Sequence, residues 1–178
     1  MDLLPGLSSL QNLHPLIVHF PIALVVLTLL FEGLWVVTKR DNFREFATWL
    51  LYLGAVAAVA GVVTGLWASD SLGHDAPGHE FVHEHRDAMY WTTGILVVIA
   101  AAVAFLKDLR EGAARKFLIV ALLIVNGMLM YGADKGGRLV YEFGMGVKAM
   151  QEQAATHEEA GSEETTEHSH EDSGGHEH

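Results

Sequence analysis

The chain has 178 residues, of which 51% are hydrophobic, and it contains no cysteine. Its positive mean hydropathy of +0.27 is typical of an integral membrane protein. The absence of cysteine excludes disulfides, thiolate nucleophiles, iron–sulfur clusters and covalently attached c-type haem, so any metal has to be held by His, Met, Asp or Glu. The net charge is −11, and nine acidic residues but no Lys or Arg lie in 151–178. We therefore expect no nucleic-acid partner.

Four apolar stretches are long enough to cross a bilayer as helices, at about 16–38, 46–68, 88–106 and 117–133. The short loops 39–45 and 107–116 hold seven of the eleven Lys and Arg residues. The positive-inside rule puts such loops in the cytoplasm. The pattern predicts an all-α, integral membrane four-helix bundle with both termini and the 69–87 loop on the outer, periplasmic side.

The first span begins with the motif His14-Pro15-Leu16-Ile17-Val18-His19-Phe20-Pro21. Pro15 suits the first turn of a helix, but Pro21 removes a bond to the Ile17 carbonyl, so we expect a kink near His19. A histidine that enters lipid is costly unless it faces a partner, which predicts that His19 points into the bundle. Its ring could bind a metal or haem iron, or hydrogen-bond a freed carbonyl.

Every histidine falls on the expected outer side, in the outer ends of the spans, the 69–87 loop or the tail. His85 stands at the mouth of the third span, at a depth comparable with that of His19. We therefore expect His19 and His85 to bind opposite faces of a b-type haem, with one or two haems per chain. His14 and His83 are reserve ligands or, with Arg86, partners of the haem propionates.

A second reading of the outer histidines is a divalent-metal site. His79 and His83 share a face if this segment is helical, and His79-Glu80-Phe81-Val82-His83 matches the H-E-x-x-H pattern of zinc proteases. A protease site needs a third ligand and a walled cleft, and a loop of about twenty residues between two spans offers little room to build one, which argues against a protease. Binding or transport of Zn, Cu or Ni stays open, as does a structural subunit whose histidines are incidental.

Small and polar residues inside the spans predict helix contacts. Gly61 and Gly65 form a small-xxx-small pair that lets helices approach closely or leaves room for a flat cofactor. Glu32 and Asn126 are expected to make interhelical hydrogen bonds, because unpaired polar groups are costly in lipid.

The region after the fourth span divides into two parts. Residues 134–147 mix charges, glycines and apolar side chains, which favours a short segment in the outer interface that could cap the site. Residues 151–178 are acidic, rich in histidine and free of aromatic residues, and they predict a disordered tail that binds metal ions loosely or docks a basic partner. Residues 1–150 then form the transmembrane domain.

Three motifs together carry a family resemblance: His14-Pro15 with Val18-His19-Phe20-Pro21, His85 before the third span, and Gly136-Gly137-Arg138-Leu139-Val140-Tyr141 followed by Gly144 and Gly146-Val147. Over roughly 12–148 the chain resembles an uncharacterised family of bacterial four-helix membrane proteins, domain of unknown function 2231. The resemblance implies a multi-pass protein of the bacterial inner membrane. Such proteins are similar in outline to membrane cytochrome b subunits that accompany multihaem c-type cytochromes.

These observations favour a haem b-binding subunit of a respiratory or photosynthetic complex rather than a stand-alone enzyme. It would move electrons between a quinol or membrane partner and periplasmic c-type cytochromes, while the redox chemistry belongs to the haem.

Overall fold

The computed structural model describes residues 13–70 and 78–145, and all the regular structure in these ranges is helical. The elements are α2 (His14–Ile17), α3 (His19–Thr38), α4 (Asp41–Asp70), α5 (His79–Phe105), α6 (Lys107–Glu111), the 3-10 helix η1 (Ala113–Phe117) and α7 (Leu118–Tyr141). All of them belong to one compact unit, Asn12–Phe143, and the following account concerns that unit. Residues 71–77 of the predicted 69–87 loop, residues 146–150 and the acidic tail lie outside the described residues.

Four helical stretches are long and apolar enough to cross a membrane: His14–Thr38, Asp41–Asp70, His79–Phe105 and Ala113–Tyr141. The prediction of an all-α protein with four spans is thus confirmed for the part of the chain that the structure describes. Each helical stretch starts before the apolar run found in the sequence, and the second and fourth also end after it, because a helix continues in polar turns after it leaves the hydrocarbon.

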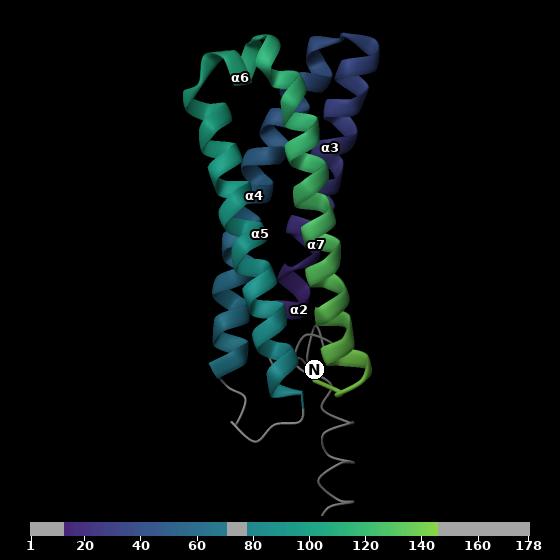
Figure 1. Ribbon diagram of the computed structural model, residues 1–178, viewed down its shortest axis with the longest axis vertical. Helices are drawn as coiled ribbons and strands as arrows, with labels where there is room; N and C mark the ends of the chain where they lie inside the picture. Colours follow the sequence, from purple (N-terminus) through teal and green to yellow (C-terminus); the bar gives the residue numbers. More distant parts are fainter. Residues whose placement is uncertain (1–12, 71–77, 146–178) are drawn as a thin grey trace, which may run out of the picture. The chain divides into compact units, whose positions relative to one another are not determined.

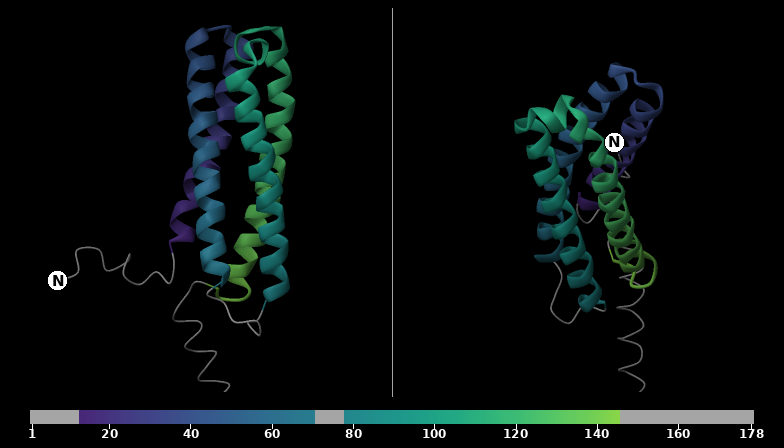
Figure 2. Two further views of the ribbon diagram at one scale, coloured as in Figure 1. Left: turned by 90° about the vertical axis from the view of Figure 1, so that its left-hand side faces the viewer. Right: turned by 45° about the horizontal axis from the view of Figure 1, so that its top comes forward.

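The four long helices form an up-and-down bundle (Figures 1 and 2). α3 packs against α4 and α7, and α5 packs against the same two helices. α2 continues α3 at one end, and α6 with η1 joins α5 to α7 at the opposite end (Figure 1). We call these the α2 end and the α6 end.

The core takes apolar side chains from every long helix. Val25, Leu51, Leu96 and Leu122 are almost completely buried at the centre. Large apolar side chains also cover the outer surface, including Trp49, Phe105 and Met130. Such a surface suits contact with lipid, which solvates apolar side chains as well as a protein core does.

The first span is broken where the proline pattern indicated. α2 ends at Ile17 and α3 starts at His19, with Val18 as a turn between them. Because Pro21 has no N–H to donate, the ladder is interrupted here, and the next bond, from the Ile22 N–H to the Val18 carbonyl, is long at 3.4 Å. The helix is therefore interrupted one residue before His19, where the sequence predicted that it would be kinked or locally opened.

The fourth helix differs from its prediction. It does not end near Ala133 but runs through Tyr141, so residues 134–141 of the expected interfacial segment are part of α7. Arg138 pairs with Glu142 one turn later, and the Lys135 ammonium lies 2.5 Å from a Glu84 carboxylate oxygen on α5. These contacts allow the charged turns to remain helical beside α5.

Candidate histidine site

Two imidazoles meet at the α2 end of the bundle. The rings of His14, the first residue of α2, and His85, in the second turn of α5, have centroids 6.2 Å apart and planes at 76° to each other. Both residues are half-buried. The first and third spans therefore each contribute one histidine to the same place.

Each ring is held by the backbone of a neighbouring helix. His14 Nδ1 lies 3.0 Å from the Gly61 carbonyl on α4 and 3.3 Å from the Thr64 hydroxyl, while His85 Nδ1 lies 2.8 Å from the Gly132 carbonyl on α7. A carbonyl only accepts, so Nδ1 carries the hydrogen in both rings and Nε2 carries the lone pair. Histidines that bind metals are typically oriented in this way by their second ring nitrogen.

Glycines form the surface on which the rings rest. A Cβ added to Gly65 would lie 2.9 Å from His14 Cε1, and a Cβ added to Gly136 would lie 2.9 Å from His85 Cε1. That is closer than real Cβ contacts, so any larger residue at either position would displace the ring. The Gly61–Gly65 pair, predicted to serve helix packing or a flat cofactor, thus binds and seats His14.

Of the predicted ligand pair, His19 and His85, only His85 takes part in this contact. The ring that faces His85 is that of His14, which the sequence indicated as a reserve ligand, while His19 lies exposed in the first turn of α3. Position in the sequence did not show that His14 rather than His19 faces His85. The stronger signal was the glycine pair on α4, whose partner ring could have been sought across the bundle.

The other predicted residues lie outside this pair. His79 and His83 are in contact one turn apart on α5, with ring centroids 4.6 Å apart, as helical spacing predicted. Arg86 pairs with the neighbouring Asp87 at 3.2 Å. Within residues 13–70 and 78–145, no group of three or more His, Asp or Glu side chains could hold a metal ion.

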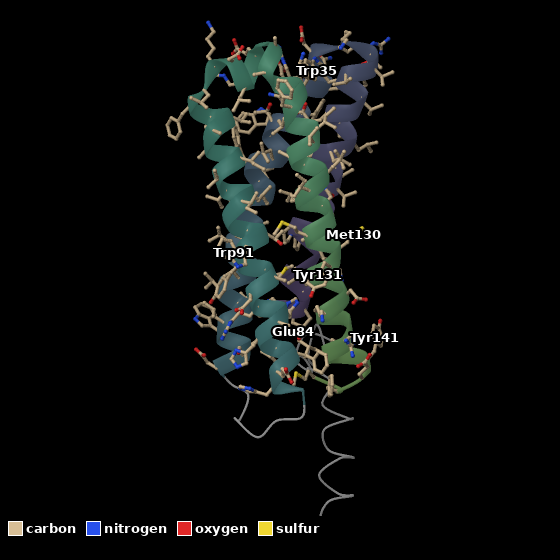
Figure 3. All side chains as sticks on the ribbon, viewed as in Figure 1. Trp35, Glu84, Trp91, Met130, Tyr131 and Tyr141 are labelled. Atoms are coloured by element: carbon tan, nitrogen blue, oxygen red, sulfur yellow. The ribbon has the colours of Figure 1, made fainter. Side chains whose placement is uncertain are left out.

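Cations and aromatic rings surround the same end of α5 and α7. The Lys135 ammonium lies over the ring of Tyr131, at 5.4 Å, and the Arg138 guanidinium lies 4.5 Å from the ring centre of Phe81. Figure 3 shows Tyr131 and Glu84 on these two helices. Hydrogen bonds from Arg138 lower the pKa of the Glu142 carboxyl below its usual range, so this carboxylate is ionised at neutral pH.

The family described as predicted membrane protein (DUF2231) matches residues 10–149. The chain belongs to this family. The match includes all four spans and both facing histidines, and it ends before the acidic tail. No curated protein and no solved structure matches the chain.

At the α6 end, this DUF2231 protein contains a fully buried ion pair. Arg115 of η1 forms a two-pronged contact with the Glu32 carboxylate, and its guanidinium also donates to the Thr48 hydroxyl at 2.9 Å. The carbonyls of Arg44 and Arg110 accept two further bonds, at 3.2 and 2.9 Å. The expected interhelical bond of Glu32 is therefore present.

Two polar contacts, one at the α6 end and one near the middle of α7, differ from what the sequence indicated. Arg115 appeared to be a loop charge, but it is buried beside Trp35, which Figure 3 labels near α6. Asn126 donates to the Leu122 carbonyl, one turn back in its own helix, at 2.8 Å. The expected hydrogen bond of Asn126 was interhelical, whereas the bond in the structure lies within α7.

Proposed function

We propose that this protein binds a haem b between His14 and His85 and serves as an electron-transfer subunit of a bacterial inner-membrane complex. The observation that carries the proposal is the pair of facing imidazoles, each held through Nδ1 by a glycine carbonyl. The pair supports one haem per chain.

The separation of the two rings is compatible with such a ligand. Two imidazoles that bind one metal from opposite sides, each at about 2.0–2.1 Å, have ring centroids about 6.3 Å apart. The separation of 6.2 Å between His14 and His85 is close to this value. A haem needs only two protein ligands because its porphyrin supplies the other four, whereas ordinary metal sites in proteins use three or four side chains.

When bound, the haem supplies one-electron chemistry, and the residues of the chain determine its setting. His14 and His85 would hold the haem iron, with ring planes fixed by their backbone bonds. The apolar core beyond them, including Val25 and Leu96, excludes water and lowers the local dielectric, which tunes the potential.

The position of the site along the bundle indicates which electron-transfer partners it could reach. The Lys- and Arg-rich loops lie at the α6 end, so the positive-inside rule puts the α2 end and the histidine pair on the periplasmic side. Periplasmic c-type cytochromes could exchange electrons there, with a membrane subunit or a quinol as the other partner.

The test is the visible spectrum of the purified full-length protein, oxidised and then reduced. A reduced b-type band is expected that disappears in His14→Ala and in His85→Ala and persists in His19→Ala, the matched control. Loss of the band in His19→Ala with retention in His14→Ala would instead support the His19–His85 pair. A haem-free protein that binds stoichiometric Zn or Cu, lost in His79→Ala, would overturn the proposal in favour of a metal-binding protein.

A further inference from the structure

The two facing histidines occupy equivalent places in the two halves of the bundle. Each bonds the carbonyl of a glycine 47 residues further along the chain, Gly61 for His14 and Gly132 for His85. The glycines on which the two rings rest, here called the glycine seats, also match. A Cβ added to Gly65 would lie 2.9, 3.2 and 3.6 Å from Cε1, Nδ1 and Nε2 of His14, and a Cβ added to Gly136 would lie at the same distances from these atoms of His85. Two unrelated sites would not be expected to agree in every one of these contacts.

The equivalence extends along the helices. His14 and His85 are separated by the same 71 positions as Arg44 and Arg115. At this shift, buried residues of one half correspond to buried residues of the other: Pro21 and Thr92, Val25 and Leu96, Glu32 and Val103, Ala47 and Leu118, Leu51 and Leu122, Gly54 and Val125, Ala58 and Leu129, Gly61 and Gly132. Both halves thus turn the same face of each helix inward.

Packing between the halves follows the same symmetry. The first half is the hairpin of α3 with α4, and the second is the hairpin of α5 with α7. Between them, α4 contacts α5 and α7 contacts α3, and a twofold rotation exchanges these two interfaces. Since α2–α3 and α5 both run from the α2 end, the rotation axis lies along the bundle.

We infer that the chain is a tandem repeat of one histidine-bearing helical hairpin, and that the His14–His85 pair lies on its pseudo-twofold axis, with Gly65 and Gly136 as equivalent positioning residues. The identity of the ligand rests on the proposed function. The site then favours a ligand with two equivalent faces, such as a metallated planar tetrapyrrole, over a cation that needs several unlike side chains.

The repeat differs between its halves at the α6 end. Glu32 corresponds to Val103, so Arg115 has a buried carboxylate partner whereas its counterpart Arg44 pairs with Asp41 at 3.2 Å on the surface. The histidines, the carbonyls that they bond and their glycine seats are identical in both halves. The backbone contacts of the two rings are therefore shared by both halves, whereas Thr64 beside His14 corresponds to Lys135 and the ion pairs at the α6 end differ.

The first arm of the test measures ligand binding in the full-length protein. Gly65→Ala and Gly136→Ala are each expected to shift the reduced band and the reduction potential in the same direction and to lower haem occupancy to a similar extent, within about twofold. Gly94→Ala and Gly127→Ala are matched controls, since no heavy atom lies within 4 Å of a Cβ at either position. Controls that equal the seat variants, or a loss in one seat variant alone, would overturn the inference.

The second arm needs no haem. Thermal unfolding in detergent is measured for each seat variant alone and combined with His14→Ala or His85→Ala. Removal of His14 should relieve Gly65→Ala but not Gly136→Ala, and removal of His85 should do the reverse, with coupling energies of similar size. Coupling in only one half would refute the repeat and leave the haem proposal standing. Equal couplings in a protein that binds no haem would refute the haem proposal alone.

Discussion

At the residue scale, a glycine pair spaced by four positions both seats and orients each histidine. Gly61 and Gly65 are one turn apart on one face of α4, so the carbonyl that His14 bonds and the surface on which its ring rests adjoin. Absence of a Cβ allows the ring to reach the helix backbone. Gly132 and Gly136 do the same for His85. The small-xxx-small pattern here accommodates a histidine ring as well as a neighbouring helix.

The angle between the two rings gives a spectroscopic prediction. Axial imidazoles in nearly perpendicular planes leave the iron d orbitals that share the unpaired electron close in energy, so one g value becomes large. Because the His14 and His85 planes are at 76°, the oxidised protein with the proposed haem bound should give a low-spin EPR spectrum dominated by one large g value. His19→Ala should leave this spectrum unchanged. A rhombic spectrum, typical of parallel rings, would contradict the ring arrangement.

Residue spacing could not identify which histidine of the first motif faces inward. Five residues advance about 140° around an ideal helix, so His14 and His19 cannot share a face, and the turn at Val18 changes the relation further. Because the motif is apolar on all sides, no amphipathic pattern distinguishes the inner face. His85 was predicted as a ligand because charged residues beside it mark the start of the third span, so its depth in the membrane could be inferred from the sequence.

At the element scale, the helices were predictable but their ends were not. A span predicted from hydropathy ends at the first charged residues. The helix α7 continues to Tyr141 because its charged side chains form ion pairs, as Lys135 does with Glu84. The break of the first span was predictable because Pro21 acts through a local bond. The burial of Arg115 depends on Glu32, which lies in a different helix, and no local pattern includes that information.

The buried ion pair predicts an unequal response to mutation. Arg115→Ala leaves the Glu32 carboxylate buried without its partner and should cost about 3–5 kcal/mol of unfolding free energy. Arg138→Ala breaks an exposed, solvent-screened pair with Glu142 and should lower the unfolding free energy far less. Denaturant unfolding in detergent micelles compares the two variants. The double variant Glu32→Leu with Arg115→Leu should recover part of the loss, and a single-variant cost equal to that of the control would contradict the role of the pair.

At the scale of the whole bundle, two helical hairpins pack together, with the facing histidines at the α2 end and the α6–η1 connection at the α6 end. The four spans were evident from hydropathy, but the repeat was not, because few residues are identical in its halves; Arg44 with Arg115, Phe46 with Phe117 and Leu51 with Leu122 are among them. Most repeat-related positions share only burial, as Val25 and Leu96 do. Which residues are buried is known only from the packed structure, so the repeat could not be recognised from the sequence.

Orientation in the membrane is a prediction for the same scale. Because the chain has no cysteine, a single introduced cysteine reports its own side of the membrane. Asn42 and Ala113 are exposed at the α6 end, and Glu80 is exposed at the α2 end. In intact bacterial cells, a membrane-impermeant thiol reagent should label Glu80→Cys but not Asn42→Cys or Ala113→Cys, which should react only after the membrane is permeabilised. The opposite pattern would put the histidine pair at the cytoplasmic face and exclude periplasmic cytochromes as its direct partners.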